Sequence, residues 1–325
     1  MAMQLLDTKI SIRNLFSLIT SIILLSATAL ILYGLNSTIS NDISNYEIIW
    51  GLIHGVDFFQ SFQNLRYEFG SFLILWIFAN FFSAGTMFYL TGLMALSIKY
   101  YLFNKYLHYP LLAYVIYVLT FAHILDANQI RVALAVCVIF YATFISPKSK
   151  FTYLFLSIVA VLFHYSGVII LFLYFVRRPV LGLSLIVFLG FSFDIIISSS
   201  DYFAFALIWH SDPLGNVNLT SSLFIMQVCI SILCAVNWRT LSEGQKRGAF
   251  INMVGVVIYI SFLDNAVVAH RMRELSQIGI FAILFLGKRN LTAVKLITSI
   301  CLSYIVAYNL LLVFSELMSI FDVRL

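Results

Sequence analysis

Two ionisable residues stand inside otherwise apolar runs, where a charge is costly unless it is paired or reached by water. Arg131 follows the first turn of one such run. A guanidinium donates to phosphate in a planar fork and keeps its charge in any surroundings, so Arg131 is a candidate anion ligand, or else a topology anchor paired with Asp126. His164 lies between two short apolar segments, where its imidazole could accept a proton, donate a hydrogen bond to a substrate, or be a satisfied core residue.

Other charges border the apolar runs. Arg66 and Glu68 directly precede the run that begins at Phe69. They could form a surface ion pair of little energetic consequence, or Glu68 could deprotonate a substrate hydroxyl at the mouth of a cavity. Arg271 and Arg273 open a later run, and helical residues two apart point about 200° away from each other, so only one can face a given site. The sequence does not choose between them.

Three polar residues near these charges are candidates for supporting contacts: Asn128, Gln129 and Asp264. Asp264 could equally just terminate a helix. The sequence contains no Asp-x-Asp pair, no HExxH motif, no phosphate-binding P-loop and no GxSxG serine elbow. We therefore predict chemistry without metal, nucleotide or other cofactor, in which arginines neutralise an anionic leaving group, a role that elsewhere often falls to a divalent ion.

The elements that position these residues are predicted to cross a membrane. Of the 325 residues, 62% are hydrophobic and 10% are charged, whereas a soluble domain is usually about a quarter charged. We predict an all-α polytopic integral membrane protein of about ten or eleven transmembrane helices, forming a single membrane domain over 1–325. Residues 36–68 and 198–221 are predicted to be external loops, the first with an amphipathic interfacial helix over 46–62.

Helix breaks are predicted at two places. Residues 69–103 are too long for one span and short for two, and Ser83-Ala84-Gly85 indicates a kink or break within them. Residues 151–176 carry basic residues at both ends, which predicts two short helices or a re-entrant hairpin with His164 at its apex. The predicted helices are 15–35, 69–98, 111–126, 128–146, 151–163, 166–176, 180–197, 222–237, 249–264, 275–287 and 293–314.

Basic residues determine the predicted orientation. With the amino terminus in the cytoplasm, as Lys9 and Arg13 direct, fourteen of the 19 basic residues fall at cytoplasmic helix ends. On this threading Lys99 lies at a cytoplasmic helix end and Asp126 at an outer one. The basic residues assigned to the outer face are Arg66, Arg131, Arg271, Arg273 and Arg324. The candidate site is therefore predicted to face the outside of the cytoplasmic membrane.

Three short motifs resemble, in their order and spacing, those of the EpsG-like branch of Wzy-type polysaccharide polymerases, over about Tyr46 to Leu286. The motifs are Arg66-Tyr67-Glu68-Phe69-Gly70, similar to that family's Glu-Pro-Gly; Ile130-Arg131-Val132-Ala133-Leu134-Ala135, similar to Ile-Arg-Gln-x-Leu-Ala; and Phe163-His164-Tyr165-Ser166-Gly167, similar to Phe-His-x-Ser-Ala. Phe69, Val132 and Gly167 stand where that family usually has proline, glutamine and alanine. Whether Gln129 replaces the missing glutamine stays open.

The resemblance implies an enzyme of the bacterial inner membrane that acts at its periplasmic face, in the synthesis of O antigen of lipopolysaccharide, capsule or exopolysaccharide. It would transfer a growing glycan from undecaprenyl pyrophosphate to the sugar of another lipid-linked repeat unit. His164 or Glu68 would accept the proton from the attacking hydroxyl. The donor pyrophosphate would be held by Arg131 and by Arg271 or Arg273, with Arg66 as a further ligand.

The implied partners are undecaprenyl-pyrophosphate-linked oligosaccharides and the lipid bilayer, with a chain-length regulator and a flippase as candidate assembly partners. The basic residues behind the net charge of +5 are explained by their predicted place at cytoplasmic helix ends. We therefore expect no nucleic-acid partner.

Two other functions stay open. A flippase or exporter of the same lipid-linked substrates would also need arginines along a wet cavity. Such a protein should carry charges through both halves of the membrane, whereas here they gather at the outer side. A membrane O-acyltransferase would explain His164 but not the outer arginines, and its acyl donor would arrive from the cytoplasm.

Overall fold

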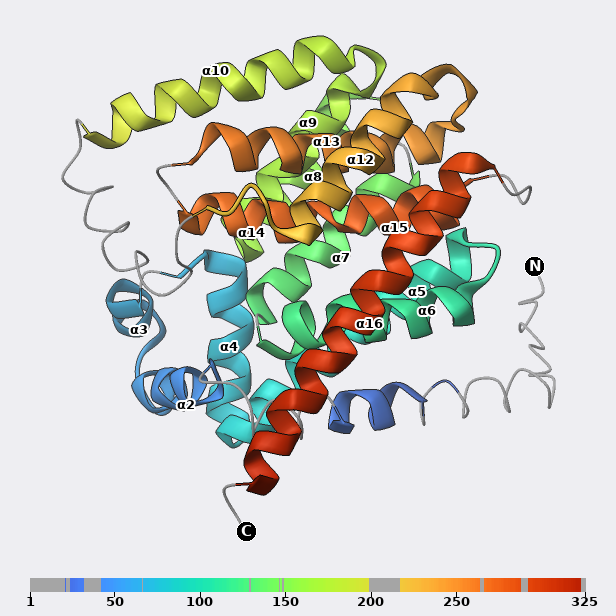
Figure 1. Ribbon diagram of the computed structural model, residues 1–325. Coiled ribbons are helices and arrows are strands. Elements are labelled where there is room, and N and C mark those ends of the chain that lie inside the picture. The colour runs from blue at the N-terminus through green and yellow to red at the C-terminus, as the bar shows by residue number, and fades with distance from the viewer. Residues whose placement is uncertain are drawn as a thin grey trace, which may run out of the picture.

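All regular secondary structure in the described part of the chain is helical in the computed structural model (Figure 1). The structure describes residues 21, 24–31, 42–65, 67–128, 130–145, 147, 149–198, 217–263, 266–287 and 292–322. Residues 24–31 are helical, and the further α-helices in these residues are α2 (Asp42–Ile53), α3 (Phe58–Leu65), α4 (Phe69–Phe81), α5 (Ala84–Tyr106), α6 (Pro110–Tyr117), α7 (Ile130–Ile145), α8 (Lys150–Phe163), α9 (Ile169–Phe172), α10 (Pro179–Ser198), α12 (Ser222–Val236), α13 (Glu243–Ser261), α14 (Ala266–Ser276), α15 (Ile278–Phe285) and α16 (Ala293–Asp322). The π-helix η1 (Val118–Asn128) extends α6, and the 3-10 turns are η2 (Tyr165–Val168), η3 (Leu173–Arg177) and η4 (Trp238–Thr240).

The segment predicted as one interfacial helix over 46–62 is two helices, so the prediction of a single continuous helix is wrong. Gly55 separates α2 from α3 with a φ of +73°, a conformation that is easy only for glycine. Asp57 then starts α3, because its Oδ1 accepts from the backbone N–H of Phe59 at 2.9 Å. Ile53 on α2 is fully buried in a cluster with side chains of α4 and α5.

The predicted break within 69–103 is confirmed at Ser83, between α4 and α5. The Ser83 hydroxyl caps α5 by accepting from the backbone N–H of Thr86 at 3.4 Å. The second predicted break is confirmed as well: α8 ends at Phe163, and η2, α9 and η3 fold back along α8. Gly167 permits this tight return, since a Cβ there would lie 2.5 Å from the Ala160 side chain.

A buried ion pair corrects the predicted threading around α5 and η1. Lys99, which was assigned to a cytoplasmic helix end, and Asp126, assigned to an outer one, form a salt bridge with side chains 0% and 1% exposed. The Tyr117 hydroxyl donates to the second Asp126 oxygen at 2.6 Å. The reason is that α5 continues to Tyr106, so Lys99 lies about two turns inside its helix and not at the helix end. The alternative pairing of Asp126 with Arg131 is therefore wrong.

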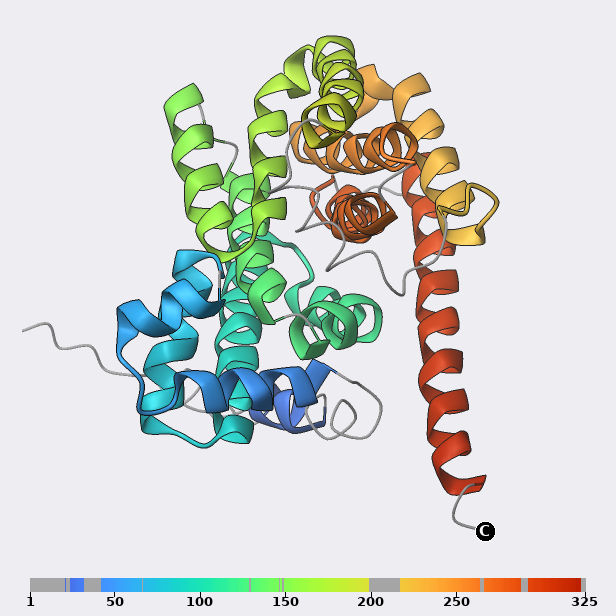
Figure 2. The ribbon, with the colours of Figure 1, turned by 90° about the vertical axis from the view of Figure 1, so that its left-hand side faces the viewer.

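Helix α13 lies at the centre of the carboxyl-terminal half. It packs against α10, α12, α14 and α15, and in Figure 1 α10, α13 and the α14–α15 pair run across the upper part of the molecule. Figure 2 shows α13 and α15 nearly end-on, with the long α16 standing beside them. The predicted start of this helix at 249 is six residues late, because a capping box of Ser242 and Gln245 begins it at Glu243.

Helix α13 approaches α14 and α15 closely through glycines. A Cβ on Gly248 would lie 2.7 Å from the carbonyl oxygen of Gly279, and Gly255 lies directly against Ser276. Small residues let helix backbones approach closely, which is the main source of helix association where no water is excluded. The run predicted as one helix over 275–287 belongs to two helices, α14 and α15, and starts earlier at Ala266.

The outer surface of the helices is strongly apolar. Phe151, Val180 and Phe188 are exposed by 67% or more, and large contiguous apolar surfaces are unusual on soluble monomers. Within the described residues one helix, Ala293–Leu311, is long and apolar enough to cross a membrane by length and composition. Shorter apolar helices accompany it over Phe69–Phe81, Pro110–Ala122, Arg131–Ile145, Lys150–Phe163, Tyr165–Arg177, Pro179–Gly190 and Ser222–Val236. These helices suggest a membrane protein.

We predict that Gly248→Ala destabilises the α13–α15 contact, because its new Cβ meets backbone atoms that cannot rotate away. Overpacking of this kind costs about 1–3 kcal/mol. Thermal unfolding of the detergent-purified protein measures the loss. The control is Gly51→Ala on α2, where nothing lies within 4 Å of the added Cβ; equal unfolding temperatures for the two variants would contradict the close packing.

We further predict that Asp126→Asn is strongly destabilising, since it leaves the buried Lys99 ammonium without its counter-charge. Removal of one partner from a buried pair costs about 3–5 kcal/mol. The double variant Lys99→Met with Asp126→Asn should regain part of the unfolding temperature, because no unpaired charge remains. An unfolding temperature for Asp126→Asn equal to that of the wild type would show that water reaches the pair.

Candidate functional site

The first two sequence motifs meet in a salt bridge. Glu68 is the N-cap residue of α4, and Arg131 lies in the first turn of α7. The Arg131 Nη1 donates to Glu68 Oε2 at 2.8 Å, with the two side chains 25% and 18% exposed. The pair is therefore shielded on most sides yet reachable, as a binding residue must be.

The third motif is fastened to the first by direct contacts. The Ser71 hydroxyl on α4 donates to the carbonyl oxygen of Phe163 at 2.5 Å. Gly70 lies against α8 so closely that a Cβ there would come 2.9 Å from the Leu162 carbonyl oxygen. The start of α4 is consequently held against the end of α8, beside His164.

His164 is buried at the break, and its hydrogen bonds indicate its tautomer. Its Nδ1 accepts from the backbone N–H of Ser166 at 3.3 Å and lies 2.6 Å from the Ser166 hydroxyl. A backbone N–H can only donate, so Nδ1 is the unprotonated nitrogen of the neutral ring and Nε2 carries the hydrogen. In this arrangement His164 is a hydrogen-bond donor through Nε2.

Tyr165 links the salt bridge to the carboxyl-terminal half. Its ring contacts that of His164 in a tilted arrangement, with centroids 4.2 Å apart and an interplanar angle of 34°, and Arg271, Glu68 and Arg131 lie within electrostatic range of its phenol. Helix α14, which carries Arg271, contacts η2. Glu68, Arg131 and Arg271 therefore lie within electrostatic range of Tyr165, and His164 is in ring contact with it.

The structure also separates the two arginines between which the sequence did not choose. Arg273 is buried on the other side of α14, where its guanidinium lies 5.0 Å from the centre of the Tyr259 ring. Its Nη1 donates to the Ser221 hydroxyl at 3.4 Å. Arg271, not Arg273, therefore shares the environment of Arg131.

A model of the EpsG family matches residues 19–321 of the chain. The chain belongs to the EpsG family. Membership implies a role in exopolysaccharide biosynthesis and confirms the resemblance seen in the three motifs. No curated protein and no solved structure matches the chain.

Several predicted site residues of this EpsG-family protein fall outside the described part of the structure: Arg66, Gln129 and Asp264. Asn128 ends η1, but its side chain is not among those described. Among the described residues, no three His, Cys, Asp or Glu side chains are grouped so that they could hold a metal ion.

Sequence reasoning missed the tyrosines that surround the site. The Arg131 guanidinium lies 4.1 Å from the centre of the Tyr67 ring, and Tyr46 of α2 lies within electrostatic range of it. Tyr67 and Tyr165 stand inside the motifs, next to Glu68 and His164, so adjacency was a signal for them. Tyr46 had no such signal, because it is far from Arg131 in the sequence.

We predict that exchanging the two charges separates folding from function. Glu68→Arg and Arg131→Glu, each alone, should reduce folded yield in the membrane, since each places two like charges in contact. The double variant should regain that yield, because a partly exposed pair contributes only about 0–1 kcal/mol in either orientation. If the reaction needs a cation at position 131, the double variant should still fail to restore polysaccharide synthesis. Restored synthesis would mean that the pair is structural only.

Proposed function

We propose that this EpsG-family protein is a metal-independent membrane glycosyltransferase, a polymerase with about ten or eleven transmembrane helices. It transfers a growing glycan from undecaprenyl pyrophosphate to a lipid-linked repeat unit at the periplasmic face of the bacterial inner membrane. The observation that carries the proposal is the Glu68–Arg131 salt bridge, held beside the His164 break by Ser71, with Arg271 within electrostatic range of the adjoining Tyr165.

The two arginines suit a departing pyrophosphate. A guanidinium carries several N–H donors in a planar fork, and Arg131 uses one of them on Glu68. Further donors of the same group can bind a phosphate oxygen without breaking that bond. Arg271 supplies a second positive charge nearby, so the negative charge that develops on the leaving group is stabilised from two sides.

Glu68 is the better proton acceptor of the two candidates. A carboxylate keeps lone pairs available beside its arginine, whereas the Nδ1 of His164 already accepts from Ser166 and its Nε2 carries hydrogen. In the proposed step the acceptor hydroxyl oxygen bonds to the anomeric carbon while the carbon–oxygen bond to the pyrophosphate breaks. The hydroxyl proton passes to Glu68, and the electron pair leaves with undecaprenyl pyrophosphate.

His164 then acts as a hydrogen-bond donor that orients the substrate, and the tyrosines offer stacking faces. Tyr67 and Tyr165 flank the charged groups, and aromatic faces pack well against the apolar faces of sugar rings. A membrane O-acyltransferase fits less well, because its histidine must accept a proton.

The buried ion pair argues against the flippase reading. A flippase would require charges along a wet path through the membrane depth, but Lys99 and Asp126 are both enclosed and paired. The partly exposed Glu68–Arg131 pair lies at the starts of α4 and α7. A reaction site at one face accounts for this distribution better than a translocation path does.

We predict that Arg131→Ala and Glu68→Gln abolish polymerisation while leaving export intact. The assay is polymer length on a gel in a strain that lacks the gene, complemented with each variant at matched membrane abundance. Loss of one positioned charged group should slow the reaction about 10²–10³-fold, leaving single repeat units where the wild type makes a ladder. Arg239→Ala, at an exposed arginine of η4, is the control and should keep the ladder.

Two outcomes would contradict the proposal. Normal ladders in both site variants would mean that these residues are structural. Absence of even single repeat units at the cell surface would mean that export, not polymerisation, has been lost.

A further inference from the structure

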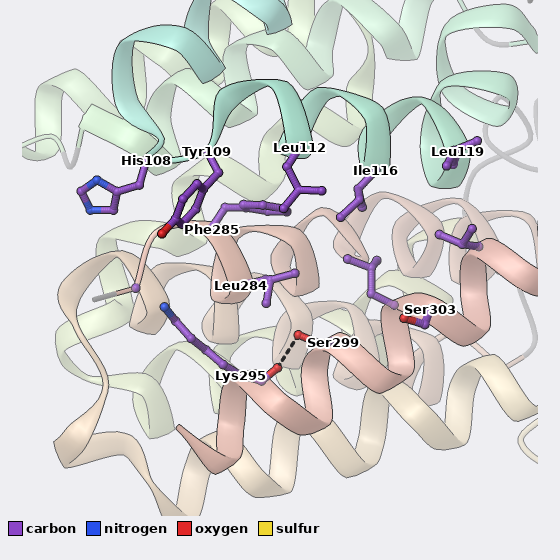
Figure 3. Close-up of a pocket in the computed structure, with 13 residues that line it drawn as sticks. His108, Tyr109, Leu112, Ile116, Leu119, Leu284, Phe285, Lys295, Ser299 and Ser303 are labelled. Carbon is purple, nitrogen blue, oxygen red and sulfur yellow. Dashed lines mark hydrogen bonds between the residues drawn. The ribbon is translucent and has the colours of Figure 1, made fainter. Parts of the chain in front are cut away.

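A second site lies away from the proposed reaction centre, between α6 and α16. A cavity of about 480 Å³ opens there, within the range of about 300–1,000 Å³ that is typical of ligand sites. Figure 3 shows Leu112 and Ile116 of α6 on one wall, and Lys295, Ser299 and Ser303 of α16 on the other. None of the residues around Tyr165 lines it.

One end of this cavity is cationic. Lys295 extends toward the end where Tyr109 points its hydroxyl, and His108 stands just beyond (Figure 3). The described lining residues include these basic side chains and no acidic one, so the potential at this end favours an anion. The same end lies at the α5–α6 connection, which the charge pattern assigns to the cytoplasmic side.

The rest of the cavity is apolar. Ser299, the hydroxyl nearest to Lys295 along α16, donates to the Lys295 carbonyl oxygen at 2.8 Å and so is turned to its own helix. Beyond it the walls are made by Leu119, Leu302 and Val306. A ligand with one anionic end and a long hydrocarbon part matches this lining.

The two helices that form the cavity also expose apolar side chains on the outside of the protein. Leu111 and Leu112 on α6 are 57% and 54% exposed, and Ile300 on α16 is 61% exposed. If the apolar exterior is in contact with acyl chains, the cavity opens sideways into the bilayer and not into water. A soluble anion would have no reason to enter such a groove.

We propose that the α6–α16 groove binds an anionic phospholipid of the adjacent leaflet, with its phosphate at Lys295 and one acyl chain along Ile116 and Leu302. The ammonium donates to the phosphate as a point charge at the depth of the headgroups. A bound lipid would fill the space between α6 and α16. Beyond this space, Asn309 of α16 donates a hydrogen bond to the Thr120 carbonyl oxygen of η1 at 2.8 Å. This site goes beyond the proposed transfer reaction, which does not involve α16.

The test is titration of the detergent-purified full chain with dioleoyl phosphatidylglycerol or dioleoyl phosphatidylcholine, read by native mass spectrometry as the fraction carrying one lipid. We expect phosphatidylglycerol to bind more tightly than phosphatidylcholine, and Lys295→Gln to weaken phosphatidylglycerol about tenfold, the value of one charge-assisted hydrogen bond. Lys295→Arg should retain binding. Lys150→Gln, at an exposed lysine of the same predicted face, should leave the affinity unchanged.

A second variant tests the groove independently of the lysine. Ser299→Phe fills the space beside Lys295 and should abolish retention of phosphatidylglycerol although the charge remains. Equal affinity for the two lipids, unchanged binding in Ser299→Phe, or competition by inorganic phosphate alone would overturn the proposal. Its failure would leave the polymerase proposal untouched, because the ladder assay reports on residues that this groove does not contain.

Discussion

A charge enclosed by apolar side chains must find its counter-charge within the protein, and this constraint connects the amino-terminal helices. Lys99 meets Asp126 in the interior, and Arg131 meets Glu68 at the surface of the same region. Desolvation makes the first pair costly to break, while the partial exposure of the second makes it adaptable. Because Asp126 and Arg131 lie on successive elements, η1 and α7, the enclosed pair also fixes where the accessible pair stands.

Helix breaks convert this framework into a site. Within a continuous helix the backbone N–H and C=O groups are bonded to each other. A break inside the packed bundle leaves some of these groups available to a ligand. The breaks before α4 and after α8 place Glu68 and His164 at neighbouring helix ends, and Ser71 fastens the two ends together. The contact of α14 with η2 brings Arg271 near Tyr165.

The two proposed sites differ in chemistry as their roles require. The site around Tyr165 combines opposite charges with aromatic rings, as expected where a bond to a phosphate breaks and sugar is held. The α6–α16 groove combines a single cationic end with a long apolar wall, which suits a molecule that is held and not transformed. Both involve lipid-linked anions, which is consistent with exopolysaccharide biosynthesis by a protein with an apolar exterior.

The sequence by itself determined the helical class, the breaks at Ser83 and His164, and three of the charged residues that meet. These follow from local causes: apolar runs, capping side chains and the cost of a charge in an apolar run. The division of α2 from α3 at Gly55 was also a local feature, but an apolar periodicity continues across it and concealed the turn.

Only the tertiary structure decided which charges pair and which arginine of α14 faces the site. Lys99 pairs with Asp126, which the charge pattern assigned to the opposite membrane face. Tyr46 lies within electrostatic range of Arg131, although no sequence pattern relates these two distant residues. The physical reason is that pairing depends on the rotation and depth of whole helices. Those are set by side-chain packing between distant segments, such as Gly248 against Gly279, and not by the residues that carry the charge.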